Sequence, residues 1–275
     1  MQCLKRMGRL FFVMLTLIGC GPRGEEDVEV TEHDPVGEQE QAACTTGGYT
    51  AYPAGITTYT SSTSGSPWSE QFSYADGELI ECDTNRSQRS YLDATSGSVY
   101  GRHVTGSDGT LYKRGWTTTY NFRAVALRNT SAGRARYTAT QTEASFYVKA
   151  LQSTTGDIRG INLFARYTDA DNLYVASFRS NGTIFISSKV NCVYRTIASS
   201  TRPVLSLNTW YTLKLTVHRQ ADGRDLLVYY INDTEVLRGY SATNNGTVEA
   251  DHLRSGTVGI RTDYVDVYLD DWRAF

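Results

Sequence analysis

The chain has 275 residues, of which 40% are apolar and 12% aromatic, enough to build a sizeable hydrophobic core. The formal net charge is −2, and the sequence has no basic stripe of the kind that follows a nucleic-acid backbone, so we expect no nucleic-acid partner. Tyr is abundant, with 19 residues, and long helix-forming blocks of Ala, Leu, Glu and Lys are missing, which argues against a helical fold.

Residues 1–19 have the pattern of an export signal. Lys5, Arg6 and Arg9 form a basic start, and the apolar run 10–18 follows. This run is too short to span a bilayer comfortably, so we interpret it as a signal peptide rather than a membrane helix.

The signal ends in Leu17-Ile-Gly-Cys20, which resembles the lipobox of bacterial lipoproteins. The resemblance implies that Cys20 is acylated and becomes the mature amino terminus, and several acyl chains make a durable anchor. Gly21, rather than Asp, follows the cysteine, which by the sorting rule of that class implies the outer membrane. An ordinary signal peptide that happens to contain Cys20 is the alternative.

The segment that follows the signal, 20–43, carries the lipidation site and many acidic residues, with almost no large apolar ones. Such a segment cannot bury enough surface to offset the entropy of ordering it, so we expect a disordered tether. A weak cation-binding segment is the alternative. The folded domain is then 44–275.

Cys44, Cys82 and Cys192 remain after signal removal and lipidation. One disulfide and one unpaired thiol is the simplest arrangement in an exported protein. We predict a Cys44–Cys82 disulfide near the start of the domain, which leaves Cys192 unpaired. The Cys and His spacings do not match a metal-binding motif.

Two hairpins are expected in the first half of the domain. Ala75-Asp-Gly77 and Ser107-Asp-Gly109 are turn signals, and each lies between short runs of apolar and aromatic residues. Further strands are expected over 120–127 and 144–151. We see no linker between these runs and the ones that follow, which favours a single domain.

Alternation of apolar and polar residues is clearest in the last part of the chain. Alternation at a period of two buries one face of a strand and leaves the other face free, as in an antiparallel sheet. The sequence therefore predicts an all-β fold. The expected strands are 160–167, 173–179, 183–187, 210–217, 226–231, 257–261 and 265–275.

Four short motifs in this region occur in the order seen in laminin-G-like modules of the concanavalin A-like lectin/glucanase superfamily. They are Phe164–Tyr174, Asn208–Leu215, Ser255–Thr262 and Leu269–Trp272. The sequence resembles these modules well over 144–275 and loosely over 68–137. The resemblance implies a jelly-roll sandwich of two antiparallel sheets, a glycan-binding sheet face or edge and, in many members, one structural Ca²⁺. Other members recognise proteins, and a minority of related folds are glycosidases or lyases.

Polar residues lie opposite the aliphatic positions of two neighbouring expected strands. Alternation places Asn162, Arg166, Ser177 and Arg179 on this other face. Arg offers forked donors to sugar hydroxyls or uronic carboxylates, and neighbouring Tyr rings stack on pyranose rings. We therefore expect this face to bind a glycan. A solvated face with cross-strand pairs is the alternative.

Two acidic pairs are candidate Ca²⁺ ligands. Asp169 and Asp171 are close in sequence and supply hard oxygen atoms, although a tight hairpin uses such residues for its own hydrogen bonds. Asp270 and Asp271 lie inside an expected strand, where Asp is disfavoured. Alternation places one of them on the inner face, where a carboxylate needs a cation, hydrogen-bond donors or a metal.

The sequence matches no known catalytic motif of this superfamily. The paired-carboxylate strand of retaining glucanases, the Gln-x-His and Tyr-x-Lys-x-Gly-x-Tyr strands of alginate-lyase-type jelly rolls, and the Gly-x-Ser-x-Gly elbow are all missing. Phe146–Lys149 is a faint partial match to the second of these strands.

The expected function is therefore that of an outer-membrane lipoprotein that binds a polysaccharide or surface glycan. Its partners would be the membrane, through the lipid anchor, and the glycan. A protein-binding or adhesion module of an envelope complex is the first alternative, and a polysaccharide lyase or glycoside hydrolase is the second.

Overall fold

Antiparallel β-strands make up the regular structure in the residues that the computed structural model describes. These residues are 68–70, 72, 92–97, 99–107, 109–117, 121–130, 133–136, 138–152, 158–244, 247–248 and 253–275, all within one unit, Asp34–Phe275. The predicted all-β class is confirmed. In this part of the chain no helix is long and apolar enough to cross a membrane. The signal peptide, Cys20, the tether and the domain boundaries lie outside the described residues and stay predictions.

The described residues form 18 strands. They are β1 (Trp68–Glu70), β2 (Leu92–Ser96), β3 (Val99–Thr105), β4 (Leu111–Thr117), β5 (Phe122–Thr130), β6 (Gly133–Arg136), β7 (Gln141–Leu151), β8 (Gly160–Asp169), β9 (Asn172–Arg179), β10 (Thr183–Val190), β11 (Val193–Thr201), β12 (Thr209–Arg219), β13 (Asp225–Ile231), β14 (Thr234–Tyr240), β15 (Thr243–Asn244), β16 (Thr247–Val248), β17 (Thr257–Asp263) and β18 (Val265–Ala274). Each run expected between Gly160 and Phe275 is one of these strands.

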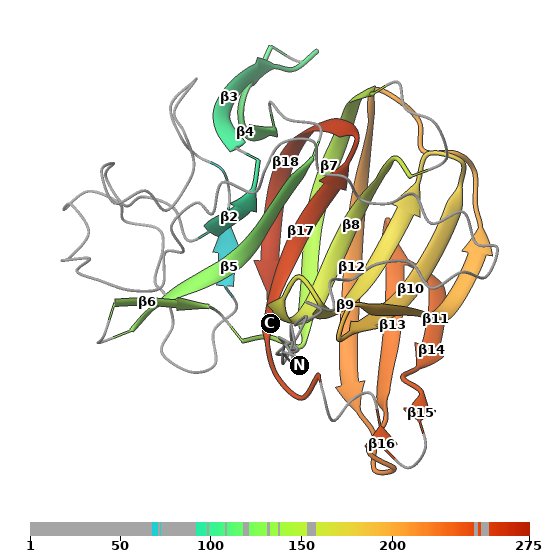
Figure 1. The fold of residues 1–275 in the computed structure, drawn as a ribbon. Helices are drawn as coiled ribbons and strands as arrows, with labels where there is room; N and C mark the ends of the chain where they lie inside the picture. The colour runs from blue at the N-terminus through green and yellow to red at the C-terminus, as the bar shows by residue number, and fades with distance from the viewer. Residues whose placement is uncertain are drawn as a thin grey trace, which may run out of the picture. The chain divides into compact units, whose positions relative to one another are not determined.

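Two large sheets contain nearly all of these strands (Figure 1). Sheet I has the order β14-β13-β12-β7-β18-β4-β3, and β1 also pairs with β18. Sheet II has the order β11-β10-β9-β8-β17-β5-β2, and β6 pairs with β5. The sheets are antiparallel and pack face to face, so the predicted jelly-roll sandwich is confirmed.

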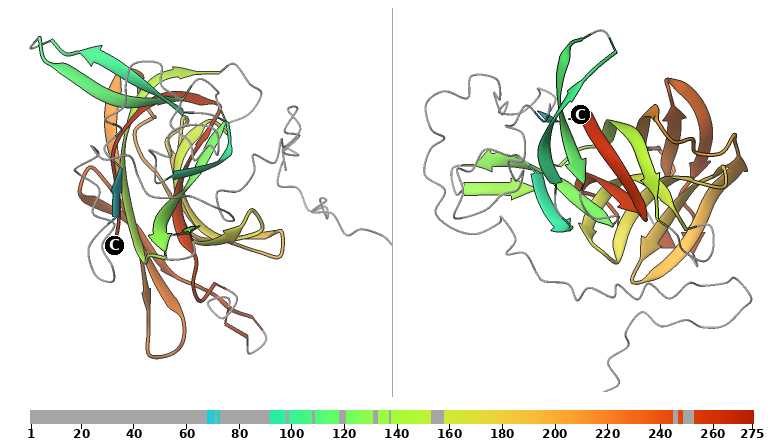
Figure 2. Two further views of the ribbon diagram at one scale, coloured as in Figure 1. Left: turned by 90° about the vertical axis from the view of Figure 1, so that its left-hand side faces the viewer. Right: turned by 90° about the horizontal axis from the view of Figure 1, so that it is seen from above.

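The last two strands occupy central positions in the two sheets. β18 lies between β7 and β4 in sheet I, and β17 lies between β8 and β5 in sheet II. The β3–β4 hairpin projects from the rest of sheet I (Figure 2). Its turn contains Gly109 with a φ of 78°, which confirms the predicted Asp-Gly turn.

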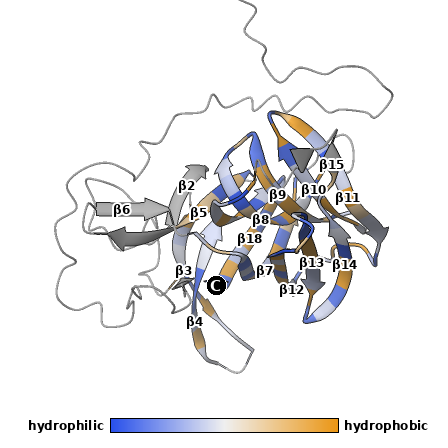
Figure 3. Ribbon diagram, turned by 90° about the horizontal axis from the view of Figure 1, so that it is seen from below, coloured by the Kyte–Doolittle hydropathy of each residue, from blue (hydrophilic) through white to orange (hydrophobic). Residues whose placement is uncertain are grey.

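The inner faces of the two sheets form the main hydrophobic core. Hydrophobic and hydrophilic bands alternate along the strands (Figure 3), as a two-residue period requires. Sheet I contributes residues such as Phe146 and Leu269, and sheet II contributes residues such as Leu163 and Ile260; all four are buried. This burial is the main driving force that holds the sheets together.

Sheet II also has a second apolar cluster, which is separate from the main core. Its members are Val125, Phe164, Tyr167, Leu173 and Val175, with Phe185 packed against them. By alternation, Phe164 faces away from its neighbour Leu163, which belongs to the main core. Strand β8 is therefore buried on both faces, and the expectation that one of its faces is free is wrong.

Substitution of Gly259 tests the packing of this second cluster. A methyl group on Gly259 would overlap the Phe164 ring and lie 2.5 Å from the carbonyl oxygen of Ala124. We expect Gly259→Ala to lower the free energy of unfolding by about 3 kcal/mol, measured by urea denaturation, because neither neighbour can move without disturbing the sheet.

Gly109→Ala is the control. A methyl group at Gly109 meets no atom within 4 Å, so only its positive φ adds a cost, of about 1 kcal/mol. If Gly259→Ala and Gly109→Ala lower the free energy of unfolding by the same amount, the close packing of Phe164 on β17 is contradicted.

Candidate functional site

Three of the predicted ligand-binding residues come together on the outer face of sheet II, where two of them contact Asp263. The Asn162 side-chain amide donates to an Asp263 carboxylate oxygen at 3.0 Å, and Arg179 lies 3.6 Å from the same carboxylate. Ser177 pairs with Asn162 across β8 and β9. Asn162 and Ser177 are 1% and 0% exposed, so the expectation that they line an open surface is wrong. Their role in ligand binding stays a prediction.

Arg166, the fourth predicted residue, has a different environment. It has a φ of 55°, lies where the β8–β9 register shifts, and donates through Nη1 to the backbone carbonyl of Arg254. Its side chain is 8% exposed, and its Nε has no hydrogen-bond partner among the described residues. The prediction that Arg166 lies in this strand is confirmed, and the prediction that it lines an open surface is wrong.

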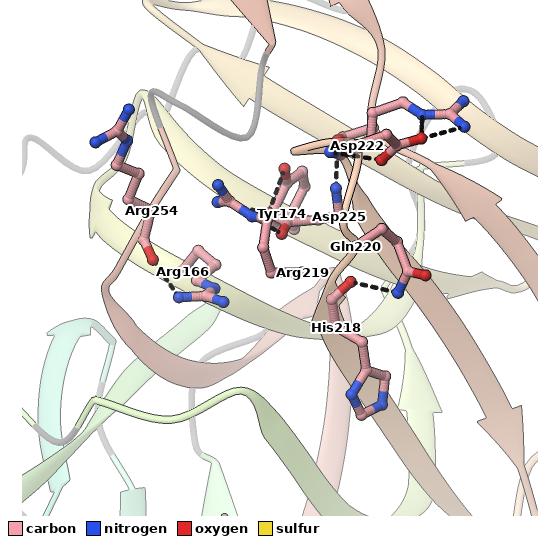
Figure 4. A network of polar contacts seen from close by, with 10 residues as sticks. Arg166, Tyr174, His218, Arg219, Gln220, Asp222, Asp225 and Arg254 are labelled. Atoms are coloured by element: carbon pink, nitrogen blue, oxygen red, sulfur yellow. Dashed lines mark hydrogen bonds and ion pairs between the residues drawn. The ribbon is translucent and has the colours of Figure 1, made fainter.

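A buried carboxylate, Asp225, links the two sheets near Arg166 (Figure 4). The hydroxyl of Tyr174, from β9, donates to Asp225 at 3.1 Å, and Nε of Arg219, from β12, donates to it at 2.6 Å. The backbone N–H of Asp225 donates to the Ser241 hydroxyl at 2.8 Å. Asp225 and Tyr174 are both 0% exposed, so this network stabilises the sandwich rather than contacting a ligand.

The Asp169–Asp171 turn uses its carboxylates for local hydrogen bonds. Asp169 accepts from the backbone N–H of Asp171 at 2.8 Å and from the Asn172 side chain at 2.9 Å, while Lys189 lies 3.2 Å from the Asp171 carboxylate. In the described part of the chain no three His, Cys, Asp or Glu side chains are grouped so that they could hold a metal ion. The geometry is that of the hairpin turn, and calcium binding stays a prediction.

Asp270 and Asp271 occupy a β-bulge in β18. The register with β7 shifts between Asp270 and Arg273, and Asp271 has a φ of 48°. The extra residue lets Leu269 and Trp272 both point into the core. The prediction that one of the two aspartates faces inward is therefore wrong, because the bulge interrupts the alternation.

Cys192 is disulfide-bonded, so the expectation that it is unpaired is wrong. Its partner lies outside the described residues, as does the predicted Cys44–Cys82 pair. If the signal peptide is removed and Cys20 is lipidated, the possible partners of Cys192 are Cys44 and Cys82. The lipid anchor and a Cys44–Cys82 disulfide therefore cannot both occur in one mature chain.

The outer face of sheet I carries an aromatic row that the sequence analysis did not identify. Its residues are cross-strand neighbours on β3, β4, β18, β7 and β12, and they are Tyr100, Trp116, Tyr268, Tyr147 and Trp210. The Tyr147 ring centroid lies 5.3 Å from that of Trp210 and 5.8 Å from that of Tyr268. Each of these side chains is at least partly exposed, and Trp210 is 38% exposed.

Cationic side chains lie over the rings of this face. Lys149 Nζ is 4.4 Å from the Tyr268 ring centroid and donates to the Tyr268 hydroxyl at 2.8 Å. The Arg102 guanidinium is 5.4 Å from the Trp116 ring. Such cation–π contacts fix the positions of the charged groups.

Arg114, from β4, reaches across the face to Trp210 on β12. Its guanidinium carbon lies 4.7 Å from the Tyr112 ring and 5.3 Å from the Trp210 ring. The Trp210 strand, β12, is separated from β4 by β18 and β7. The side chains of β4 and β12 therefore converge over the two strands between them.

Two carboxylates lie between these cations. Asp266 accepts a hydrogen bond from the Trp116 indole at 2.9 Å, and Asp270 forms an ion pair with Arg114. Partial burial raises the pKa of Asp266, although the Trp116 hydrogen bond opposes the shift. Burial raises the pKa of Asp270 to about 6; Arg114 opposes this increase, and the neighbouring Asp271 adds to it.

The aromatic row had a signal in the sequence. Trp116, Tyr147, Trp210 and Tyr268 each stand at the polar positions of an alternating run, opposite residues that are buried in the core. An aromatic residue on the outer face of a strand has no core to fill. What alternation cannot supply is the pairing of strands far apart in sequence, which brings these residues into one row.

No protein-family model matches the chain, and no curated protein matches it. A solved carbohydrate-binding module from Bacillus subtilis is similar to 67% of this chain over 96% of its own length, with a TM-score of 0.43 and 16% identity. A protein of unknown function from Shewanella oneidensis MR-1 is similar to 84% of this chain over 96% of its own length, with a TM-score of 0.43 and 13% identity.

The metal-free carbohydrate recognition domain of Emp46p is similar to 70% of this chain over 92% of its own length, with a TM-score of 0.40 and 9% identity. Values this low assign neither a family nor a ligand to the chain. The resemblance to laminin-G-like modules therefore stays a prediction.

The raised pKa of Asp270 predicts a pH dependence of stability. Its folded-state pKa of about 6 is above the ordinary 3.8, so the contribution of Asp270 to folding is full below pH 3.8 and is lost as the pH rises through 6. We expect the melting temperature of the wild type to fall between about pH 4 and pH 7 relative to that of Asp270→Asn, because the amide does not titrate.

Other titrating groups are common to both proteins and cancel in this comparison. If the difference in melting temperature between the wild type and Asp270→Asn stays constant over this pH range, the raised pKa of Asp270 is contradicted.

Proposed function

We propose that the domain binds a polysaccharide along the aromatic row of sheet I. The row itself carries the proposal, since aromatic rings on an outer sheet face cannot be explained by the core. An aromatic ring has a negative face that attracts the C–H groups of a sugar ring, and it combines a large contact area with few rotatable bonds. The charged and hydroxyl groups beside the row supply the hydrogen bonds that orient a ligand.

The length of the row favours a chain of sugars over a single sugar. It crosses adjacent strands from β3 to β12, and adjacent strands are about 4.8 Å apart, so the row is roughly 19 Å long. The convergence of Arg114 and Trp210 over the middle of the row gives a ligand contacts from both sides.

We also propose that this domain is displayed by an outer-membrane lipoprotein with its anchor at Cys20. The lipobox-like sequence and the acidic segment 20–43 support this proposal. Cys20→Ser should move the protein from the membrane fraction to the soluble extracytoplasmic fraction, because the acylated side chain is lost. A variant that remains fully in the membrane fraction would contradict lipidation at Cys20.

Alanine substitution in the row tests the binding site. Trp210→Ala and Tyr147→Ala should each lower the affinity for a polysaccharide that the wild type binds, by about tenfold or more. Central aromatic contacts contribute much of the binding free energy of such a site. A polysaccharide panel read by affinity electrophoresis identifies the ligand, and calorimetry then measures the affinities.

Tyr194→Ala is the matched control. Tyr194 is 50% exposed and also has a cation over its ring, with Lys189 Nζ at 5.0 Å, but it lies on β11 of sheet II. It should bind as the wild type does. Loss of binding in Tyr194→Ala with retention in Trp210→Ala would place the ligand elsewhere.

A second candidate function, a polysaccharide lyase, has one observation in its favour. Lys149 and Tyr268 are hydrogen-bonded at 2.8 Å in the middle of the row, and both residue types serve as general acids or bases. Scoring the same panel for shortened products distinguishes the two functions. Binding without product release favours the binding function, and product release that is lost in Tyr268→Phe favours the lyase.

A further inference from the structure

We propose that the aromatic row selects acidic polysaccharides, and that Arg114 binds the carboxylate of a uronic acid residue. This inference rests on the proposed function and adds the class of ligand. It is carried by two independent features of sheet I: the donors that Arg114 has left, and the cations that cover the rings.

Arg114 is held in place by contacts that use only part of its guanidinium. Nη1 donates to the backbone carbonyl of Lys113 at 3.0 Å and also forms the ion pair with Asp270. The planar group lies near the rings of Tyr112 and Trp210. Among the described residues, Nε and Nη2 have no hydrogen-bond partner.

Nε and Nη2 form one edge of the guanidinium. Two parallel N–H donors on such an edge match the two oxygens of a carboxylate, and a charge-assisted pair of this kind is about twice as strong as a neutral hydrogen bond. A side chain fixed by stacking loses little conformational entropy when it binds such a ligand. Arg114 is thus prepared for an anion that arrives beside Trp210.

The cations over the rings favour an anionic ligand as well. Arg102, Arg114 and Lys149 lie over Trp116, Trp210 and Tyr268, respectively. A neutral sugar that stacks on the covered side of these rings has to displace a cation. The carboxylate of an acidic sugar can instead pair with the cation, and this attraction favours binding of the acidic sugar over the neutral one.

Asp266 and Asp270 offset only part of this positive charge, because Arg102, Arg114 and Lys149 outnumber them. Asp266 accepts from the Trp116 indole, while Asp270 accepts from the backbone N–H of Asp271 at 2.9 Å in addition to its pairing with Arg114. Only 14% of the Asp270 side chain is exposed. Asp270 therefore acts as an anchor for one side of Arg114 and leaves the other side to the ligand.

The test uses pairs of polymers that differ only in charge. The probes are polygalacturonate, alginate and hyaluronan, each with its methyl ester as the neutral form, and the ligand found in the polysaccharide panel. Wild-type protein should bind at least one acid form about tenfold more tightly than its ester, the difference expected for one charge-assisted bond.

Arg114→Lys keeps the charge and removes the forked edge. It should lose about tenfold in affinity for the acid form and leave the affinity for the ester nearly unchanged. Arg224→Lys is the matched control, because Arg224 also lies over a tyrosine, 4.6 Å from the Tyr240 ring, and pairs with Asp222 at 2.7 Å, away from the row. It should bind as the wild type does. The melting temperature of each variant confirms that it is folded.

The outcomes separate this inference from the proposed function. Equal binding of acid and ester, or binding of neutral polymers alone, would overturn the acidic specificity and leave polysaccharide binding intact. An unchanged acid affinity in Arg114→Lys would remove Arg114 as the carboxylate ligand. If no polymer of either kind binds the wild type, the proposed function itself fails.

Discussion

The strand register of sheet I is the constraint on which the site depends. Residues such as Phe146 and Leu269 must face sheet II, because their burial holds the sandwich together. Since side chains alternate along a strand, the same register points Tyr147 and Tyr268 outward, as direct cross-strand neighbours. A slip of one residue would exchange the two faces, burying the row and exposing the core. The binding surface is thus a consequence of how the core packs.

The site holds charged groups at a cost in solvation. Burial of Asp270 disfavours its ionised form, and the pairing with Arg114 offsets only part of that effect. The bulge at Asp271 makes the arrangement possible, because it lets Asp270 point to the outer face while Trp272 returns to the core. Such a strained element, kept at a charged cluster beside exposed rings, is typical of a functional surface rather than of a sheet built only for stability.

The sequence predicted the strands and the sandwich because alternation and turn residues are local signals. The prediction for the outer face of sheet II was wrong. On this face Phe164 and Val175 lie next to Asn162 and Ser177 along their strands, and these apolar neighbours indicate burial, whereas the prediction of an open surface depended on the polar residues alone. The bulge at Asp271 depends on a backbone angle that alternation does not encode. The aromatic row depends on pairing between distant strands, and no local pattern contains that information.

The most direct test of the account is an NMR titration that follows the tryptophan indole N–H signals as an oligosaccharide of the bound polymer is added. The aromatic row predicts that the signals of Trp116 and Trp210 shift together with saturation, while the signal of Trp272, buried in the core, stays in place. Saturable shifts confined to the side-chain amide of Asn162, with Trp116 and Trp210 unchanged, would contradict the account and return the site to sheet II.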